Sequence, residues 1–346
     1  MSPPRAHGAP LAAAELRAEP EDFRVEEQLS FVPSGNGPHF LLQVEKRAAN
    51  TRWVAAEIAR LGGMAVAEVG YAGLKDRQAV AVQWFSVPAR PNSAEFWRGV
   101  RTDEFRVLDV HANGRKLKRG ALSGNRFCIR LRKVTWSREE LELKLAALRD
   151  HGAPNYFGPQ RFGRGGFNLD RAAQWMQSGS PPAGRAERGF ALSAARALIF
   201  NAVLARRVQA GDWSVLRPGD LASLEGSGSH FAVTAIDEEL LRRARSFDIH
   251  PSGPLWGRGE PQTQGATLDT ELEVGGEFRG LAELLQGAGL DQERRSLRCA
   301  VRDLTMESGA GTVTLSFALG RGQFATAVLR EIMEFPADTP LEGDGE

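Results

Sequence analysis

The sequence predicts a mixed α/β (α+β) protein with more than one structural unit, and three observations support this prediction. Residues 23–31 and 125–131 alternate between apolar and polar side chains, which is the period of a β-strand. Residues 51–61 carry the apolar stripe of a helix. The chain has 346 residues and exceeds the usual size of one domain, so two units are expected.

The first predicted strand, residues 23–31, has a charged residue on its apolar face. That face comprises Phe23, Val25, Leu29 and Phe31. Glu27 lies on the same face, where a carboxylate must find a partner or stay near water. Residues 34–38 are predicted to form a turn, and we expect residues 40–45 to be the returning strand.

The segment Gly-Leu-Lys-Asp-Arg at 73–77 is predicted to be a loop between two strands. A helix over 51–61 precedes it, capped by Asn50 or Thr51 and ended by Gly62-Gly63. Residues 69–72 and 78–87 are the predicted strands on either side. Side chains in such a loop can face a cleft without disturbing a core.

Basic residues are concentrated in one part of the chain, although the formal net charge is only +1. Residues 115–133 contain eight Lys or Arg and no Asp or Glu. The strip includes the strand 125–131, which has one apolar face and one basic face. A basic strip on a nearly neutral protein suits a phosphate-binding face. A solvated strand edge carries Lys and Arg for a different reason, to discourage aggregation, and the strip alone favours this second interpretation.

A composition break at residues 151–167 predicts a boundary between units. This segment contains seven Gly or Pro among aromatic residues and arginines. Aromatic rings can stack on bases and arginines can neutralise phosphates, which suits RNA binding, but a tight loop at a domain junction would also bury its aromatics. Further predicted elements are a capped helix over 137–149, helices at 192–208, 283–286, 291–297 and 324–335, and a strand at 313–319. The acidic tail, residues 337–346, is predicted to be disordered.

The common signatures of cofactor and metal chemistry are missing from the sequence. There is no P-loop, no strand followed by GxGxxG, no HExxH and no GxSxG. The six histidines are scattered, and we expect each to be a surface or loop residue rather than a metal ligand. We therefore expect no cofactor and no metal, and a chemistry that comes from side chains alone.

The expected environment of the chain is the cytoplasm. Cys128 and Cys299 have no metal-ligand spacing and are expected to be reduced thiols. No secretory signal is recognisable near the N-terminus, and no apolar run approaches the ~20 residues that a membrane span needs. We expect no membrane association, and a monomer is the default expectation.

Six strings occur in order over about residues 17 to 332. They are Pro20-Glu-Asp-Phe-Arg-Val-Glu-Glu27, Tyr71-Ala-Gly-Leu-Lys-Asp-Arg77 with Gln83, Gly124-Asn-Arg-Phe127, residues 155–163, Leu192-Ser-Ala-Ala-Arg196 with Phe200-Asn201, and Gly322-Gln-Phe-Ala-Thr326 with Arg330-Glu331. Together these strings resemble the TruD family of tRNA pseudouridine synthases. The family's last loop commonly has a proline where this chain has Gly320.

The resemblance implies a fold. It implies a pseudouridine-synthase catalytic sheet in permuted chain order, with a second α/β domain, the TRUD domain, inserted in it. On this basis the catalytic domain comprises residues 1–150 and 304–336, and the inserted domain comprises residues 151–303. The active cleft would lie between the two domains, where ligand sites often fall.

The resemblance also implies roles for individual residues. Asp76 would be the catalytic group. Phe127 would lie against the target base, and the amide of Asn125, two residues earlier on the same face, would bind the base edge. The full substrate-binding set would be Phe23, Asn125, Phe127, Gly322 and Phe324. Periodicity alone favours core packing for the three phenylalanines.

The reaction needs a carboxylate close to C1′ of the ribose. Asp76 could attack this carbon as a nucleophile, or it could remove the C2′ proton to give a glycal. Lys75 and Arg77 flank it, and nearby positive charge favours the ionised form. Because neighbouring side chains diverge, the effective cation can come from elsewhere. Arg17 and Glu27 are the supporting candidates, for pocket electrostatics or for a salt bridge to the loop.

The expected partner is tRNA, since the resembled family acts on uridine at position 13 of certain tRNAs. The predicted RNA-binding residues are Arg115, Lys116, Lys118, Arg119, Arg161 and Arg164. Two other classes of function remain open. One is a non-catalytic RNA-binding or RNA-folding module on the same scaffold. The other is a carboxylate-based hydrolase of nucleosides or sugars, which would need a second carboxylate across the bond.

Overall fold

The computed structural model describes residues 3–335, and these form two compact units. The sheet unit comprises residues 12–136, 302–322 and 334–335. The helical unit comprises residues 3–11, 137–301 and 323–333. The domain boundaries at 150/151 and 303/304 remain a prediction from the family resemblance.

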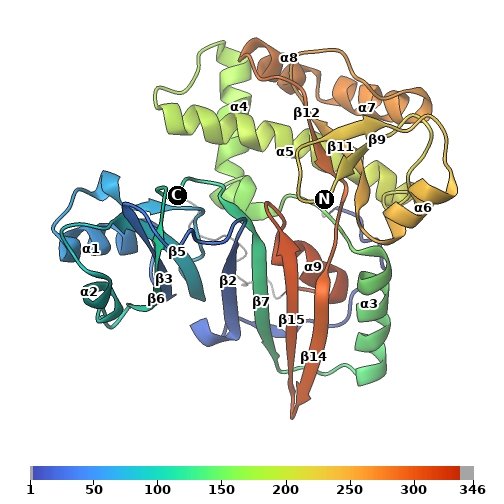
Figure 1. Cartoon of the computed structure of the whole chain (residues 1–346). Helices are drawn as coiled ribbons and strands as arrows, with labels where there is room; N and C mark the ends of the chain where they lie inside the picture. The colour runs from blue at the N-terminus through green and yellow to red at the C-terminus, as the bar shows by residue number, and fades with distance from the viewer. Residues whose placement is uncertain (1–2, 336–346) are drawn as a thin grey trace. The chain divides into compact units, whose positions relative to one another are not determined.

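The sheet unit is built on one large mixed sheet, shown in Figure 1. Its strands are β1 (Glu15–Leu16), β2 (Phe23–Leu29), β3 (His39–Arg47), β4 (Gly70–Tyr71), β5 (Val80–Pro88), β6 (Phe105–Asn113), β7 (Leu122–Arg132), β14 (Arg302–Gly309) and β15 (Thr312–Gly320). The main path runs β14-β15-β7-β2-β5-β3-β6, while β1 pairs with β7 and β4 pairs with β5. The late hairpin β14–β15 therefore joins strands that are far earlier in the chain.

The predicted return of residues 40–45 beside the first strand is wrong. The strand exists as β3, but β5 lies between β2 and β3 and pairs in parallel with β2. The residues of β5 from Val80 to Val87 are all buried, and a strand buried on both faces belongs inside a sheet rather than at its edge. β2 also ends at Leu29, so Phe31 lies beyond it and is 37% exposed.

Two helices cover one face of β3, β5 and β6. These are α1 (Thr51–Gly62) and α2 (Ala94–Arg98). The predicted cap of α1 is confirmed, because the Asn50 side chain accepts a hydrogen bond from the main-chain N–H of Arg52. Its predicted end is also confirmed, since Gly63 has a φ of 64° and only glycine adopts this left-handed conformation without strain. The core here includes Leu42, Val44, Val54, Ile58, Phe85, Trp97 and Val107.

The helical unit is organised around one long helix. Its helices are α3 (Arg138–His151), α4 (Phe167–Ser178), α5 (Arg185–Ala210), α6 (Glu238–Arg245), α7 (Gly265–Glu277), α8 (Arg279–Gly287) and α9 (Ala325–Ile332). Its strands are β8 (Ala153–Pro154), β9 (Leu221–Leu224), β10 (His230–Ala232), β11 (Ile249–Leu255), β12 (Glu293–Ser296) and β13 (Arg298–Cys299). Short 3₁₀ turns η1 (Pro20–Asp22), η2 (Val66–Glu68), η3 (Pro159–Arg161) and η4 (Arg164–Gly166) complete the elements of both units.

Helix α5 is the core helix of this unit. Ala195, Ile199 and Val203 pack in one cluster with residues of α4, α7 and α8. Phe200 and Leu204 pack in a second cluster with Tyr156 and Trp213. By length and composition α5 is the one helix within residues 3–335 that could cross a membrane, but a buried core helix has the same properties.

The predicted helix at 291–297 is wrong. Residues Glu293–Ser296 form β12, which pairs antiparallel with β11. Within β12 the Arg294 guanidinium is buried in an ion pair with Glu271 at 2.8 Å, so tertiary partners override a helix-favouring composition. The predicted capping box of Ser137 and Glu140 and the strand at 313–319 are confirmed. The predicted tail at 337–346 lies outside the described residues.

We expect Gly124→Ala to lower the free energy of unfolding by about 1–3 kcal/mol, because overpacking forces the backbone to shift. Gly124 pairs with Gly320 between β7 and β15, and a Cβ atom there would lie 2.2 Å from the main-chain oxygen of Leu319. Urea unfolding followed by tryptophan fluorescence measures the change. Gly189→Ala in α5 is the control, since a Cβ there meets nothing within 4 Å and should not destabilise the protein. Equal stabilities of the two variants would contradict the expectation.

Candidate active site

The loop at 73–77 connects β4 to β5 in the sheet unit, as predicted, and hydrogen bonds to buried side chains hold it. The Lys75 N–H donates to Thr51 Oγ1 at 3.0 Å, and the Thr51 hydroxyl donates to Gln83 Oε1 at 3.0 Å. The Gln83 amide nitrogen in turn donates to the Gly73 carbonyl at 2.5 Å. Thr51 and Gln83 are 1% and 0% exposed, so the main chain of the loop is fixed from inside the core.

Asp76 forms an ion pair with Arg17. Arg17 Nη2 lies 2.7 Å from Asp76 Oδ2, and the two side chains are 7% and 17% exposed. Burial lowers the pKa of Arg17, while Asp76 acts in the opposite direction. Arg17 has a φ of 61°, a left-handed conformation that residues with side chains adopt at a cost. The cation beside Asp76 therefore comes from outside its own loop.

The two neighbours of Asp76 in the chain, Lys75 and Arg77, do not pair with its carboxylate. Lys75 Nζ lies 2.6 Å from Glu27 Oε2, and the two side chains are 7% and 0% exposed. The expectation that Glu27 finds a partner on the apolar face of β2 is thus confirmed. Arg77 has an exposed side chain. The Gln78 N–H donates to Asp76 Oδ1 at 3.0 Å, which orients the second carboxylate oxygen.

Lys46 is a buried residue of this site that the sequence reasoning missed. Its ammonium group donates to the carbonyls of Ala49 at 2.6 Å, Asp76 at 2.9 Å and Lys75 at 3.4 Å. The residue is 0% exposed, and burial lowers its pKa to about 8. A signal was present in the sequence, because the alternation of Leu42 and Val44 puts Lys46 next on the apolar face of β3.

Aromatic rings line the strands next to Asp76. The Phe23 and Phe127 ring centroids are 6.1 Å apart with an edge-to-face geometry, and Phe127 is 5.4 Å from Phe317. The Arg17 guanidinium lies 4.2 Å from the Phe23 centroid. Phe23 and Phe127 are 5% and 6% exposed, so both belong to the core of the sheet unit and expose little surface to a ligand.

Asn125 lies beside these rings with a buried acceptor. It pairs with Glu27 of β2 and with Leu319 of β15 in the register of the sheet. Its Oδ1 is buried and has no hydrogen-bond partner within the described part of the chain. Leaving such an atom unpaired costs free energy unless a ligand completes it.

The last two predicted substrate-binding residues belong to different units. Gly322 ends the sheet-unit segment that follows β15, and its φ of 75° needs glycine. Phe324 precedes α9 in the helical unit, where its ring centroid is 6.4 Å from that of Phe157.

The basic strip, residues 115–133, has two parts: a loop part with exposed basic side chains and a strand part whose basic side chains mostly form ion pairs. Arg115 and Lys118 are exposed on the loop between β6 and β7, and neither takes part in an ion pair within residues 3–335. Lys116 donates to the Ala67 carbonyl, and Arg119 donates to the Tyr71 hydroxyl at 3.2 Å. The strand part is largely neutralised, through the pairs Arg126–Asp303, Arg132–Asp22, Arg132–Glu19 and Lys133–Glu15.

The two predicted RNA-binding residues of the helical unit differ in burial. Arg164 is exposed. Arg161 lies 5.0 Å from the Phe157 ring centroid and donates to Ser193 Oγ at 2.9 Å. Burial lowers the pKa of Arg161. Arg164 is thus the more accessible of the two.

Other chemistry-bearing groups do not assemble into a second site. Within residues 3–335 no group of three or more His, Cys, Asp or Glu could hold a metal ion. The expectation of a surface histidine is wrong for His250, which is buried in β11. Arg298 donates to its Nδ1 at 2.9 Å, so Nε2 carries the proton that Glu225 accepts at 2.8 Å. Both ring nitrogens are thereby satisfied, which allows the ring to be buried.

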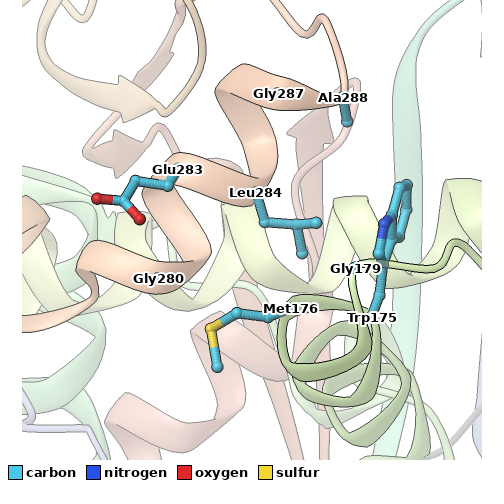
Figure 2. Close-up of a pocket in the computed structure, with 8 residues that line it drawn as sticks. All are labelled: Trp175, Met176, Gly179, Gly280, Glu283, Leu284, Gly287 and Ala288. Atoms are coloured by element: carbon cyan, nitrogen blue, oxygen red, sulfur yellow. The ribbon is translucent and has the colours of Figure 1, made fainter.

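A pocket of about 350 Å³ lies in the helical unit between α4 and α8. Figure 2 shows Trp175, Met176 and Leu284 on its walls, with Glu283 as the one acidic side chain among the residues that line it. None of the predicted site residues lines this pocket.

The site in the sheet unit defines a class of protein. A largely buried ion pair of a carboxylate with a guanidinium lies next to an aromatic ring, an unpaired amide acceptor lies on β7, and exposed basic residues lie on the loop between β6 and β7. These features suit an enzyme that acts on RNA with its own side chains.

The comparisons with known proteins assign the family. The family model of tRNA pseudouridine synthase D (TruD) matches residues 6–180 and 188–332, so the chain belongs to this family. It is 47% identical to tRNA pseudouridine synthase D of Nitrosococcus oceani over 94% of this chain and 91% of the relative. It is 44% identical to that of Methylococcus capsulatus, over 96% of this chain and 94% of the relative. The structure of a protein described as tRNA pseudouridine synthase D from Methanosarcina mazei covers 95% of each chain with a TM-score of 0.73 and 20% identity. This likeness confirms the predicted fold class.

We expect Glu27→Gln to destabilise the protein by about 3–5 kcal/mol, because it leaves the Lys75 ammonium buried without its counter-charge. Chemical denaturation of Glu27→Gln and of the double variant Glu27→Leu/Lys75→Met measures the loss and its recovery. The double variant should recover most of the loss, since it removes both charges. Glu57→Gln, which breaks an exposed pair with Arg60 on α1, is the control and should cost less than about 1 kcal/mol. A small effect of Glu27→Gln would refute the buried-pair interpretation.

Proposed function

We propose that this chain isomerises uridine in tRNA to pseudouridine and that Asp76 is the catalytic group. Membership of the tRNA pseudouridine synthase D family supports the reaction. The observation that carries the assignment to Asp76 is its ion pair with Arg17, at 2.7 Å and largely buried. The guanidinium orients the carboxylate through a charge-assisted hydrogen bond, and the reaction needs an oriented carboxylate beside the ribose.

Pseudouridine formation breaks the N1–C1′ bond of a uridine, turns the freed uracil and joins C5 to C1′, after which C5 loses its proton. The uracil must first leave the stack, at a cost of a few kcal/mol. The edges of Phe23 and Phe127 offer apolar contact to the extruded base. Asn125 Oδ1 is an acceptor for the N3–H of uracil, and this hydrogen bond would satisfy an otherwise unpaired buried atom.

Asp76 acts at the sugar in either of two routes. As a nucleophile it bonds to C1′ while uracil departs, and C5 later displaces it. As a base it takes the C2′ proton and uracil leaves to give a glycal. Both routes begin from the ionised carboxylate, and Arg17 supplies the positive charge that holds it. A uridine deuterated at C2′ distinguishes them, because only proton removal gives a primary isotope effect.

The remaining expectations complete this proposal. We assign uridine 13 of tRNA as the target, a cytoplasmic location, and a monomer that works without cofactor or metal. Exposed Arg115 and Lys118 are the first candidates for contact with tRNA phosphates, and Gly322 and Phe324 stay candidates for substrate binding.

We expect Asp76→Asn to abolish pseudouridine formation and to leave tRNA affinity within about twofold, because the amide keeps the shape but cannot carry the charge. Pseudouridine mapping on a total tRNA pool, with filter binding in parallel, measures both. Asp103→Asn, a change at an exposed acid of the same unit, is the matched control and should be fully active. Normal product from Asp76→Asn would eliminate the catalytic role, and absence of product from the wild type would favour a non-catalytic RNA-binding module.

We expect tRNA affinity to fall steeply with salt, since phosphate contacts release counterions. In the double variant Arg115→Ala/Lys118→Ala the slope of log K against log salt should become shallower by roughly 1 for each residue. Fluorescence anisotropy with labelled tRNA between low and moderate salt measures the slope. Arg60→Ala is the control, because Arg60 is already paired with Glu57. An unchanged slope in the double variant would place the phosphate contacts elsewhere.

A further inference from the structure

Lys46 holds the main chain of the loop that carries Asp76. Two of its three acceptors, the carbonyls of Lys75 and Asp76, belong to that loop, and the third belongs to Ala49, just before α1. The contacts are made by a single ammonium group that is 0% exposed. An ammonium has three donors and no acceptor, so these carbonyls use its full capacity.

The charge of Lys46 is not balanced by a direct ion pair. Lys46 takes part in no salt bridge within residues 3–335, unlike Lys75, which is paired with Glu27, and Arg17, which is paired with Asp76. The charged groups that act on it are Asp76, which favours its protonated form, and Lys75, which opposes it. Its counter-charge is therefore the carboxylate of Asp76 itself, acting across the loop.

Stability alone does not explain a charged residue in this position. Burial disfavours the charged form and lowers the pKa of Lys46 to about 8 from the ordinary 10.5. At pH values between about 8 and 10.5, Lys46 is protonated more in the unfolded chain than in the folded chain. The contribution of Lys46 to stability therefore rises with pH over this range. The fold thus keeps a protonated lysine at neutral pH against a desolvation cost, and such costs concentrate at functional sites.

We propose that Lys46 is a positioning residue for the reaction: its ammonium group fixes the main chain at Lys75 and Asp76 and so holds the Asp76 carboxylate in its reactive orientation. This inference rests on the proposed role of Asp76. The neutral amine keeps one lone pair in place of a proton, so it can satisfy only two of the three carbonyls and places a lone pair against the third. Deprotonation therefore loosens the loop, and a carboxylate displaced by even 1 Å loses much of its reactivity.

The first test is Lys46→Met, measured as the single-turnover rate constant at pH 7 with enzyme in excess over tRNA. We expect the rate constant to fall by about tenfold or more while the Kd for tRNA stays within about twofold. The matched control is Lys144→Met, which removes another ammonium that donates to two carbonyls, those of His7 at 2.5 Å and Ala9 at 2.6 Å. This control should keep the wild-type rate. A wild-type rate in Lys46→Met would overturn the proposal.

The second test is the pH profile, which a purely structural role would not reproduce. The wild-type rate constant should fall as pH rises above about 8, whereas the rate of Lys46→Met should lack this fall. Over the same range the stability of wild type relative to Lys46→Met should rise, opposite to activity. A flat wild-type profile up to pH 9.5, or the same alkaline fall in Lys46→Met, would overturn the proposal.

Two further measurements keep the outcomes distinct. If Lys46→Met does not fold, Lys46→Gln, which retains a polar donor, takes its place, and the wild-type profile tests the proposal without any variant. Asp76→Asn is assayed in parallel. Loss of product in Asp76→Asn together with full activity in the Lys46 variants would sink only the positioning role. Full activity in Asp76→Asn would instead sink the catalytic role on which it rests.

Discussion

The need to pair charges inside the sheet unit sets the geometry around the loop at 73–77. Glu27 is buried in the middle of β2, and within residues 3–335 its one ion pair is with Lys75. An uncompensated charge at such a position costs several kcal/mol, so the loop must approach β2 closely enough for the ion pair to form. Once Lys75 is fixed in this way, Asp76 has to point elsewhere, and it meets Arg17. The catalytic candidate therefore owes its position to its neighbour in the chain.

The strands beside this loop bring together segments that are far apart in sequence. In the register of the sheet, Asn125 of β7 lies between Glu27 of β2 and Leu319 of β15, and Phe127 lies between Val25 and Phe317. β7 is thus the shared partner of an early strand and a late one. Residues 20–27 on β2, residues 71–77 before β5 and residues 124–127 on β7 thus supply neighbouring parts of the sheet unit, although they are far apart in the chain.

The parts of this structure that were predictable are those with a local periodic signal. The buried position of Glu27 followed from the alternation in β2, and the cap and end of α1 followed from Asn50 and Gly63. Lys46 obeys the same rule as Glu27, but the predicted strand stopped at residue 45, one residue before it. Pairing between strands leaves no such signal, and for this reason the insertion of β5 between β2 and β3 was not foreseen.

Two features of the structure needed information beyond periodicity. The partnership of Arg17 with Asp76 joins residues far apart in the chain, and no periodic pattern links them, although Arg17 was a candidate for a salt bridge to the loop. The segment 291–297 was assigned as a helix because its composition favours one. Its hydrogen bonds to β11 and the buried pair of Arg294 with Glu271 make it a strand. In both cases a tertiary contact decides the outcome, and local sequence does not encode it.

The way the loop is held suggests how the work of the reaction is divided between enzyme and RNA. The main chain at Gly73, Lys75 and Asp76 is bonded to side chains from β3, α1 and β5, and these are fully buried or nearly so. A loop with so many internal contacts is preorganised, and closure over the substrate is not needed to place its carboxylate. On the proposed mechanism, the large movement then falls to the nucleotide, which leaves its stack to reach Asp76. A hydrogen bond from the base to the unpaired Asn125 Oδ1 would offset part of the free-energy cost of that movement. The free-energy cost of positioning the carboxylate thus arises during folding, when charges are buried, and the cost of unstacking the nucleotide arises during binding.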